Sequence, residues 1–252
     1  MIPEWQRRTA RLLGDEAVER LAASHVTVVG VGGVGGYAAE ILARSGIGRI
    51  TVIDADLVAE SNINRQLIAT APDVGRPKVD LFAERFRAIN PDIEVNAVRE
   101  FVTPENVAGL IPADTDFVID AIDTVAPKVA LLIHCQRSGT DVVSSMGAGG
   151  RTDPTRVRYL DISETRDDGL ARAVRQRLRK AGVREPLMVV ASTEPPHTAS
   201  VIRLEERNKR SSFGTTAAVP ATFGICLGNY AVMRIAEGKE TKNHKSSIIE
   251  DD

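Results

Sequence analysis

The stretch Gly30-Val31-Gly32-Gly33-Val34-Gly35 decides the fold of this sequence. It follows a short β-branched run at residues 25–29 and leads into residues 34–44, which we expect to form a helix. Glycines between a strand and a helix permit a tight turn and let backbone N–H groups approach a phosphate at the helix N-terminus. The pattern therefore predicts a nucleotide site, with these residues nearest the phosphates: Gly30, Gly32, Gly33 and Gly35.

A second apolar run, residues 49–53, ends at Asp54, about 20 residues after the glycines. An acidic side chain at that point can hold the hydroxyl groups of a ribose. Both runs are apolar throughout rather than alternating, as expected when helices cover both faces of a sheet. Taken alone, this set indicates an adenosine nucleotide, and NAD is the usual ligand of such a pattern.

Strands and helices continue to alternate as far as about residue 150. The further elements that we expect are strands at 93–98, 117–119 and 141–145 and helices at 4–23, 78–90 and 126–138. Alternation of this kind predicts a Rossmann-like α/β fold, a doubly wound and mostly parallel sheet with right-handed crossovers. Residues 1–150 thus form the nucleotide-binding core, including an N-terminal helix.

The pattern changes after Gly147-Ala148-Gly149-Gly150. Residues 151–237 predict a C-terminal extension that completes the domain, with strands at 156–162 and 188–192 and a basic helix at 168–181. Residues 195–212 are polar and charged, so we expect them to be mobile. The tail at 238–252 has too little apolar content for a packed core, and we expect it to be disordered.

Composition limits the classes of protein to consider. The net charge of −2 does not indicate a nucleic-acid binder, so any basic surface must be local. Cys135 and Cys226 lie in apolar stretches, where a core role is favoured over catalysis. Residues 219–236 are apolar but interrupted by glycines, which indicates a buried helix and leaves membrane contact as the weaker alternative. The N-terminus shows no secretory signal, so we expect a cytoplasmic protein.

Polar side chains suited to a triphosphate follow the second and fourth strands. They are Asp56, Ser61, Asn62, Asn64, Arg65, Gln66 and Lys78, then Asp120, Asp123 and Thr124 after the fourth strand. The carboxyl ends of parallel strands meet at one crevice, so these groups can converge there. Two cations and a carboxylate fit ATP with Mg²⁺ better than a dinucleotide: Arg65 and Lys78 neutralise charge as pyrophosphate leaves, and Asp123 holds the metal.

The combined motifs Gly-x-Gly-Gly-x-Gly, Asp-x-Asp, Ser-Asn-x-Asn-Arg-Gln and Asp-x-x-Asp resemble those of the ubiquitin-activating-enzyme-like superfamily, with its MoeB, ThiF and HesA types. The resemblance covers about residues 5–150. It implies that Gly33, Asp54, Asn62, Arg65, Lys78 and Asp123 contact ATP or its metal. It also implies a homodimer in which an N-terminal arginine crosses the interface; Arg8 matches that position best, and Arg11 is the alternative.

A narrower resemblance covers nearly the whole chain. It rests on Asp120-Ala121-Ile122-Asp123 with Pro127-Lys128, on Gly147–Gly150 with Asp153-Pro154-Thr155, on Ser192-Thr193-Glu194 and on Ala221-Thr222-Phe223-Gly224. These stretches are similar to the tRNA threonylcarbamoyladenosine dehydratase family. That implies ATP-dependent cyclisation of the threonylcarbamoyl group on adenosine 37 of tRNA: the carboxylate attacks the α-phosphate, and an atom of the neighbouring urea then closes the ring and expels AMP.

The basic helix is the candidate tRNA contact. Arg172, Arg175 and Arg179 fall on one side at helical spacing, and Lys180 follows them. Such side chains supply phosphate contacts, although a solvated helix face has the same pattern. Phe213 and Tyr159 are the candidates for stacking on a base.

Other functions stay open at this point. A MoeB- or ThiF-like enzyme would adenylate the C-terminal glycine of a ubiquitin-like sulfur carrier, but the paired Cys-x-x-Cys zinc ligands common there are missing from this sequence. An NAD-dependent oxidoreductase would leave Arg65, Lys78 and Asp123 without a role. A non-catalytic adaptor would bind ATP without releasing pyrophosphate. A sulfur-trafficking protein is a further candidate partner.

Overall fold

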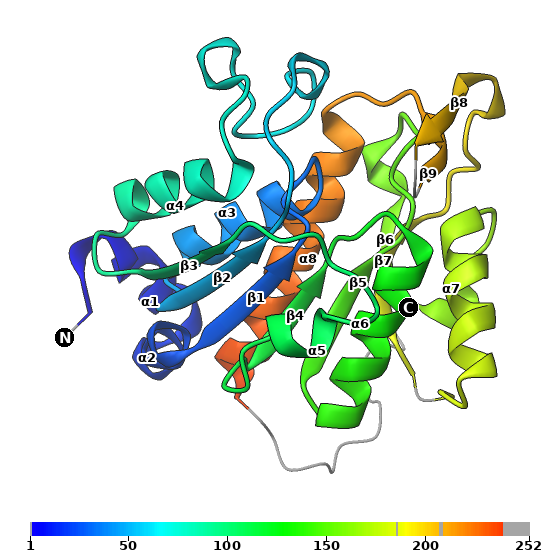
Figure 1. Ribbon diagram of the computed structural model, residues 1–252. Coiled ribbons are helices and arrows are strands. Elements are labelled where there is room, and N and C mark those ends of the chain that lie inside the picture. Colours follow the sequence, from blue (N-terminus) through cyan, green and yellow to red (C-terminus); the bar gives the residue numbers. More distant parts are fainter. Residues whose placement is uncertain (1, 185, 207–208, 239–252) are drawn as a thin grey trace, which may run out of the picture.

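A seven-stranded sheet forms the centre of the computed structural model, in the order β3-β2-β1-β4-β5-β7-β6 (Figure 1). The structure describes residues 2–184, 186–206 and 209–238. The strands are β1 His25–Val29, β2 Arg49–Ile53, β3 Glu94–Val98, β4 Phe117–Asp120, β5 Asp141–Ser145, β6 Val157–Asp161 and β7 Met188–Ser192. All neighbours pair in parallel except β6 with β7. The predicted fold class is confirmed, and the extension after residue 150 adds two strands to the same sheet.

Helices cover both faces of the sheet (Figure 1). They are α3 Gly35–Ser45, α4 Lys78–Ile89, α5 Val107–Leu110, α6 Val125–Ser138, α7 Gly169–Lys180 and α8 Ala218–Glu237. One core contains the apolar sides of α3, α4 and α8, while α5 and α6 pack on the opposite face and α7 packs beside α6. Strands β1, β2 and β4 are rich in β-branched and apolar residues and are buried between these layers except for Arg49, as expected for strands with helices on both faces.

Helix α8 is the buried helix expected at residues 219–236. Its glycines let it lie directly on α3: a Cβ on Gly224 would come 2.2 Å from the Val34 carbonyl oxygen, and one on Gly228 would come 2.7 Å from that of Ala38. The interruptions in the apolar run are therefore packing contacts. Among the described residues, no helix is long and apolar enough to cross a membrane.

The single helix predicted at residues 4–23 is wrong. The segment forms a short 3₁₀ turn and then two helices, α1 Arg7–Leu13 and α2 Asp15–Ala23. Gly14 separates them with a φ of +89°, a conformation that a side chain disfavours, and its N–H closes α1 on the Ala10 carbonyl.

A second feature was missed in the polar segment 195–212. It contains a β-hairpin, β8 Val201–Glu206 and β9 Lys209–Phe213, which leads back to α8. Of the tail expected to be disordered, only Gly238 is described; residues 239–252 lie outside the described residues.

His25, at the start of β1, is buried among polar partners. Its Nε2 lies 2.8 Å from Thr51 Oγ1 and its Nδ1 3.2 Å from Asp114 Oδ1. Burial, with help from the positive charge of Arg49, lowers the pKa of His25 below its ordinary 6.5, against the opposing effect of Asp114 and Asp116. The folded protein therefore favours the neutral imidazole.

We expect this histidine to make stability fall below pH 6.5. The unfolded chain takes up a proton there before the folded chain does, so the contribution is complete above pH 6.5 and is lost as the pH falls towards the lower folded pKa. Urea unfolding at a series of pH values measures it. His25→Gln should flatten the profile between about pH 6.5 and 5.5, above the range in which ordinary carboxylates titrate. An equally steep profile in the variant would show that another group is responsible.

Candidate nucleotide site and basic surface

The glycines of the first loop have two different roles. A Cβ on Gly35 would lie 1.8 Å from the Gly30 carbonyl oxygen, and one on Gly30 would lie 2.9 Å from that of Ala121, so these two are needed for packing. A Cβ on Gly32 or Gly33 would meet nothing closer than 3.4 Å. Packing therefore does not require glycine at these two positions, which stand at the N-terminus of α3, where the N–H groups of the first turn and the helix dipole favour an anion.

Asp54 ends β2 beside this loop. Its Oδ2 accepts a hydrogen bond from the Val31 N–H at 2.8 Å, and its Oδ1 accepts one from the Asp56 N–H at 2.9 Å. Burial raises the pKa of Asp54, although the nearby Lys78 and both hydrogen bonds oppose the shift. The carboxylate is thus fixed by the backbone, in the position expected for a group that binds ribose hydroxyls.

Lys78 begins α4, and only 3% of it is exposed. Its Nζ lies 2.8 Å from Oδ2 of Asp56, whose own side chain is 66% exposed. A buried ammonium with one solvent-exposed partner can exchange that partner for a phosphate oxygen without moving its backbone. The structure therefore brings together both predicted residues, Asp56 and Lys78, next to Asp54.

The loop at residues 61–66 presents polar groups to the same region. Arg65 is half-buried, and its Nη1 donates to the Ser61 carbonyl at 2.8 Å and to Asn64 Oδ1 at 3.0 Å. A Cβ on Gly33 would touch Arg65 Cγ at 3.4 Å, so the arginine stem lies directly over the glycine loop. Asn62 is buried, and its Oδ1 accepts from the Ala59 N–H at 3.1 Å. This side chain therefore stabilises the turn and does not face outwards.

Gln66 supplies an observation that points to a ligand. Its side chain is buried beside Gly32, yet no donor in the described part of the chain reaches its Oε1. Buried polar atoms nearly always have a hydrogen-bond partner. An orphaned acceptor beside the glycine loop is the position in which a polar ligand would find a hydrogen-bond partner.

Asp120 lies beneath the predicted nucleotide site and does not line it. It is fully buried, and its Oδ2 accepts from Lys128 Nζ and from Ser144 Oγ, both at 2.6 Å. Lys128 also donates to the Ser145 carbonyl at 2.9 Å. The pair joins the ends of β4 and β5 to the first turn of α6, so Asp120 supports the site from beneath it. We did not predict this role for Lys128; the signal was a lysine one turn into a helix that follows a buried aspartate.

Asp123 and Thr124 follow Asp120 in the loop before α6. Asp123 is exposed at the carboxyl edge of the sheet, and Thr124 is half-buried as the N-cap residue of α6. Across the described residues, no group of three or more His, Cys, Asp or Glu side chains could hold a metal ion.

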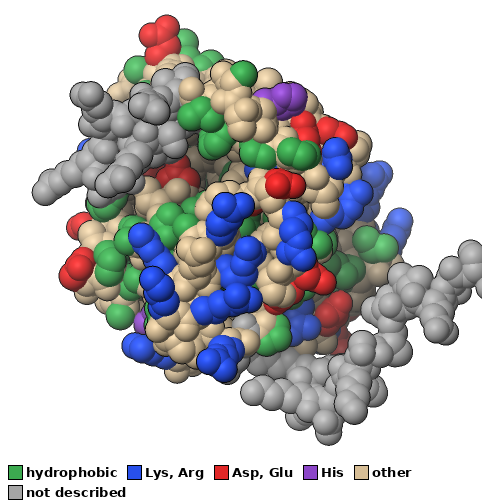
Figure 2. Space-filling model, turned by 90° about the vertical axis from the view of Figure 1, so that its right-hand side faces the viewer, with side chains coloured by type: hydrophobic (Ala, Val, Ile, Leu, Met, Phe, Trp, Pro, Cys, Tyr) green, Lys and Arg blue, Asp and Glu red, His purple; other side chains and the backbone are tan. Residues whose placement is uncertain are grey.

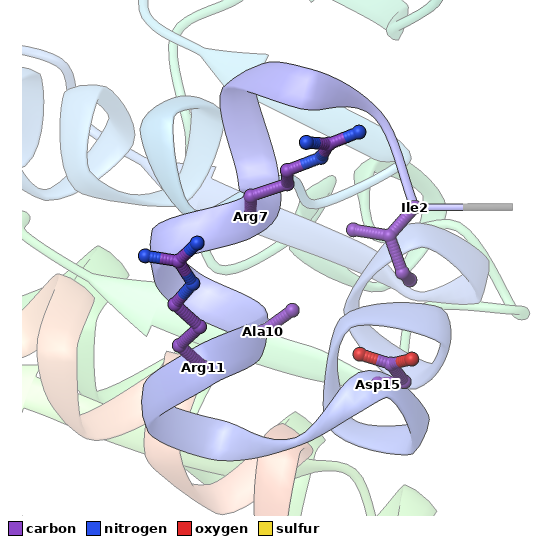
Figure 3. Close-up of a pocket in the computed structure, with 5 residues that line it drawn as sticks. All are labelled: Ile2, Arg7, Ala10, Arg11 and Asp15. Atoms are coloured by element: carbon purple, nitrogen blue, oxygen red, sulfur yellow. The ribbon is translucent and has the colours of Figure 1, made fainter.

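The predicted N-terminal arginines do not reach this site within one chain. Gln6 Nε2 donates to the carbonyl of Arg44 at the C-terminal end of α3, which is about 16 Å along the helix axis from the glycine loop. Arg8 and Arg11 are exposed on α1. Figure 3 shows Arg11 and Arg7 projecting from α1 beside a shallow pocket of about 330 Å³ that Ile2 and Asp15 also line.

The basic helix is α7, and Figure 2 shows Lys and Arg side chains gathered on the side of the molecule that it covers. Arg172, Arg179 and Lys180 are exposed, as predicted. Arg175 differs, because its Nη1 donates to Thr165 Oγ1 at 2.7 Å and to the Ile162 carbonyl at 2.9 Å. It is half-buried and stabilises the preceding turn, so of the four predicted phosphate-binding residues it is the least available to bind a phosphate.

Comparisons with known proteins show the family of this chain. A family model described as the ThiF family matches residues 5–248. The tRNA threonylcarbamoyladenosine dehydratase of Escherichia coli (strain K12) is 41% identical over 252 residues, 92% of this chain and 94% of that protein. The protein of the same name from Bacillus subtilis (strain 168) is 41% identical over 246 residues, 94% of this chain and 97% of that protein.

A solved structure is similar over the same length. The crystal structure of the E. coli dehydratase in complex with ATP has a TM-score of 0.85 to this chain at 40% identity, and the match covers 94% of this chain and 97% of that one. The resemblance inferred from the motifs is confirmed. The chain belongs to the ThiF family and, within it, to the tRNA threonylcarbamoyladenosine dehydratases.

Proposed function

We propose that this protein uses ATP to dehydrate threonylcarbamoyladenosine in tRNA to its cyclic form. The observation that carries the proposal is the convergence of the glycine loop before α3, Asp54, Arg65 and Lys78 at one sheet edge, in a chain 41% identical over nearly its full length to dehydratases of that name. With tRNA as the substrate, we expect the activity in the cytoplasm. Adenylation of a sulfur-carrier protein is the related second candidate.

The residues divide the work by position. The N-terminus of α3 and the guanidinium of Arg65 bind phosphate oxygens, Asp54 orients the ribose, and Lys78 leaves Asp56 for the departing pyrophosphate. Asp123 would hold Mg²⁺, which supplies further neutralisation of the phosphates. The substrate carboxylate attacks the α-phosphate to give an acyl-adenylate. The urea group then bonds to the same carbonyl carbon and AMP leaves, so no protein nucleophile is required.

The two cysteines fit this reading better than a sulfur relay. Burial raises the pKa of Cys135 to about 12, and burial also raises that of the half-buried Cys226. Neither is a thiolate near neutral pH, and the thiolate is the reactive form. We therefore do not add a sulfur-trafficking partner to the proposal.

Mass spectrometry of the nucleosides tests the function. The purified protein is incubated with ATP, Mg²⁺ and threonylcarbamoylated tRNA, and the modified nucleoside should lose one water only when ATP is present. If the protein binds ATP but the nucleoside stays unchanged, the proposed dehydratase activity is wrong, and a carrier protein is favoured as the carboxylate donor.

We also propose that two copies of the chain form the active unit. On α1, Arg8, Arg11 and Leu12 lie at positions i, i+3 and i+4 and share one face, and Leu12 is 82% exposed. An apolar side chain flanked by arginines that have no ion-pair partner within residues 2–184, 186–206 and 209–238 suits burial against a second copy. In that arrangement Arg8, or Arg11 in its place, reaches the phosphates bound by the partner.

Subunit mixing tests this arrangement. Arg8→Ala and Arg65→Ala should each be inactive alone, but a mixed dimer purified through two different tags should regain activity. The reason is that the site of the Arg8→Ala subunit keeps its own Arg65 and receives an intact arginine from the other subunit. A fully active Arg8→Ala homodimer would shift the assignment to Arg11, and inactivity of the mixed dimer would contradict the exchange.

The exposed arginines of α7 should set the salt dependence of tRNA binding. We expect Arg172→Ala/Arg179→Ala to reduce the slope of log K against log salt concentration by roughly 1.4–1.8, because each lost phosphate contact removes about 0.7–0.9. Filter binding at several salt concentrations measures the slope. Arg87→Ala, on the exposed last turn of α4, is the matched control. If the double variant kept the wild-type slope, α7 would not lie on the RNA path.

A further inference from the structure

Three loops meet around a small pocket beyond the carboxyl ends of β5 and β7. Gly150 comes from the loop after β5, His197 from the loop after β7, and Thr215 and Thr216 from the connection between β9 and α8. The volume is about 230 Å³. That is below the range of about 300–1,000 Å³ for sites that enclose a whole ligand, so the pocket suits one moiety of a larger substrate.

An aromatic ring is seated beside this pocket on bare backbone. A Cβ on Gly149 would lie 2.9 Å from Phe213 Cβ, and one on Gly150 would lie 2.8 Å from Phe213 Cδ1. The two glycines therefore make room for the ring, which Pro196 also approaches from the loop after β7, since its Cβ would be 3.3 Å from a Cβ on Gly150. Phe213 is nevertheless only half-buried; the pocket is lined by Gly150, which the ring contacts, and by its chain neighbour Gly214, so the ring borders the pocket rather than lining it. An aromatic ring presented in this way can stack on a base.

Buried charges fix the frame of the pocket. The carboxylate of Glu194 accepts hydrogen bonds from the N–H groups of Thr152 at 3.0 Å and Asp153 at 2.9 Å, and from Thr152 Oγ1 at 3.0 Å. Those backbone bonds lower the pKa of Glu194, which stays ionised and faces His197 Nε2 at 3.5 Å. The pocket is thus held by an organised polar network, with one imidazole on its exposed rim.

The same frame reaches the basic helix. Buried Arg151 donates from Nε to the Glu194 carbonyl at 3.0 Å and lies 3.5 Å from the carboxylate of Asp168. Asp168 caps α7 by accepting from the Ala171 N–H at 2.9 Å, and it also accepts from the Gly147 N–H at 2.9 Å. RNA held by α7 is therefore held by an element that is bonded directly to the pocket loop.

The nucleotide site lies on the other side of the pocket. Asn64, in the loop that carries Arg65, donates to the Thr215 carbonyl at 3.0 Å. The pocket follows β5 and β7, whereas the predicted triphosphate lies beyond β1 and β4. Strands stand about 4.8 Å apart, so two strand spacings, about 10 Å, separate the end of β4 from that of β7. A group in the pocket could thus extend a side arm of several bonds to the phosphates.

We propose that this pocket binds the purine base of the modified adenosine, stacked on Phe213, so that its threonylcarbamoyl arm extends across β5 to the ATP at the end of β4. The assignment rests on the proposed function and adds the place where the substrate is recognised. Phosphate contacts along α7 then give affinity, and the pocket selects a base that has left the anticodon-loop stack.

Binding of two RNA probes tests this pocket. One is an anticodon stem-loop carrying threonylcarbamoyladenosine, and the other is identical but abasic at that position. The wild type should prefer the first, and Phe213→Leu should weaken that RNA by roughly 5- to 100-fold, as expected for a lost base stack, while leaving the abasic RNA unchanged. Phe213→Tyr should retain the preference, and Phe101→Leu, an exposed phenylalanine beyond β3 at the far end of the sheet, is the matched control.

The α7 variant separates the two kinds of contact, because Arg172→Ala/Arg179→Ala should weaken both RNAs equally. If Phe213→Leu unfolds, Thr216→Tyr fills the pocket from its exposed rim and should abolish the same preference. An undiminished preference in a folded Phe213→Leu or Thr216→Tyr protein overturns the pocket, even when the wild type dehydrates tRNA. A wild type that shows no preference also overturns it, whereas a wild type that prefers the modified RNA but leaves the nucleoside unchanged overturns only the proposed reaction.

Discussion

Lys128→Met should lower the free energy of unfolding by about 3–5 kcal/mol, because it leaves the Asp120 carboxylate buried without its cation. Both side chains are fully buried, and Lys128 Nζ has three acceptors: Asp120 Oδ2, Ser144 Oγ and the Ser145 carbonyl. Methionine is close in length and apolar, so the change removes the charge with little change in volume. For a chain of this size the loss corresponds to roughly 6–20 °C in Tm.

Urea unfolding of the single and double variants measures the pair. Asp120→Asn/Lys128→Met carries no buried charge and should be more stable than Lys128→Met, since removing both members of a buried ion pair is often close to neutral. The comparison separates the free-energy cost of the unpaired carboxylate from the cost of the lost lysine packing. A single variant within about 1 kcal/mol of the wild type would show that Asp120 becomes protonated or hydrated at little cost.

This pair also shows why the site forms where it does. Asp120 joins the end of β4 to Ser144 on β5, and its Oδ1 accepts from the Ile122 N–H at 3.1 Å. The loop with Asp123 therefore leaves the sheet from a fixed point. A buried polar network of this kind positions functional side chains that themselves remain exposed.

The sequence predicted those parts of the site that depend on local pattern. The glycine loop, Asp54 and Lys78 are each specified by their place at the end of a strand or the start of a helix, so spacing alone located them. The break at Gly14 was not predicted, although a glycine followed by Asp15 and Glu16 is a usual sign of one helix ending and another beginning.

Other features depend on contacts between distant segments. Arg175 has the helical spacing of a surface residue, but its acceptors lie ten and thirteen residues earlier in a turn that periodicity does not describe. Gly149 and Gly150 look like a loop in sequence, and only the fold brings Phe213 onto them. In β8, Ile202 and Leu204 alternate with Arg203 and Glu205, but β9 has no apolar residue before Phe213, so the pairing of the two strands could not be read from the chain.

Arg65→Ala should lower kcat by about 10²–10³ while changing the affinity for ATP much less. The argument is that the guanidinium acts when charge builds up on the departing pyrophosphate, and an interaction made only in the transition state affects kcat and kcat/KM together. The fold should survive, because Arg65 is half-buried and its own hydrogen bonds go to Ser61 and Asn64 within the same loop. Arg65→Lys should recover part of the loss, since it keeps the charge but not the bidentate fork.

Two assays separate the possible roles of this arginine. Release of pyrophosphate with modified tRNA reports the adenylation step, and nucleoside mass spectrometry reports the completed ring; both should fall by the same factor if Arg65 serves the first step. Arg87→Ala removes an exposed arginine at the far end of α4 and should leave both rates unchanged. If Arg65→Ala raises KM for ATP and leaves kcat unchanged, Arg65 binds the triphosphate equally in the ground state and the transition state. In that case Lys78, buried and paired with one exposed carboxylate, would be the cation that responds to the leaving group.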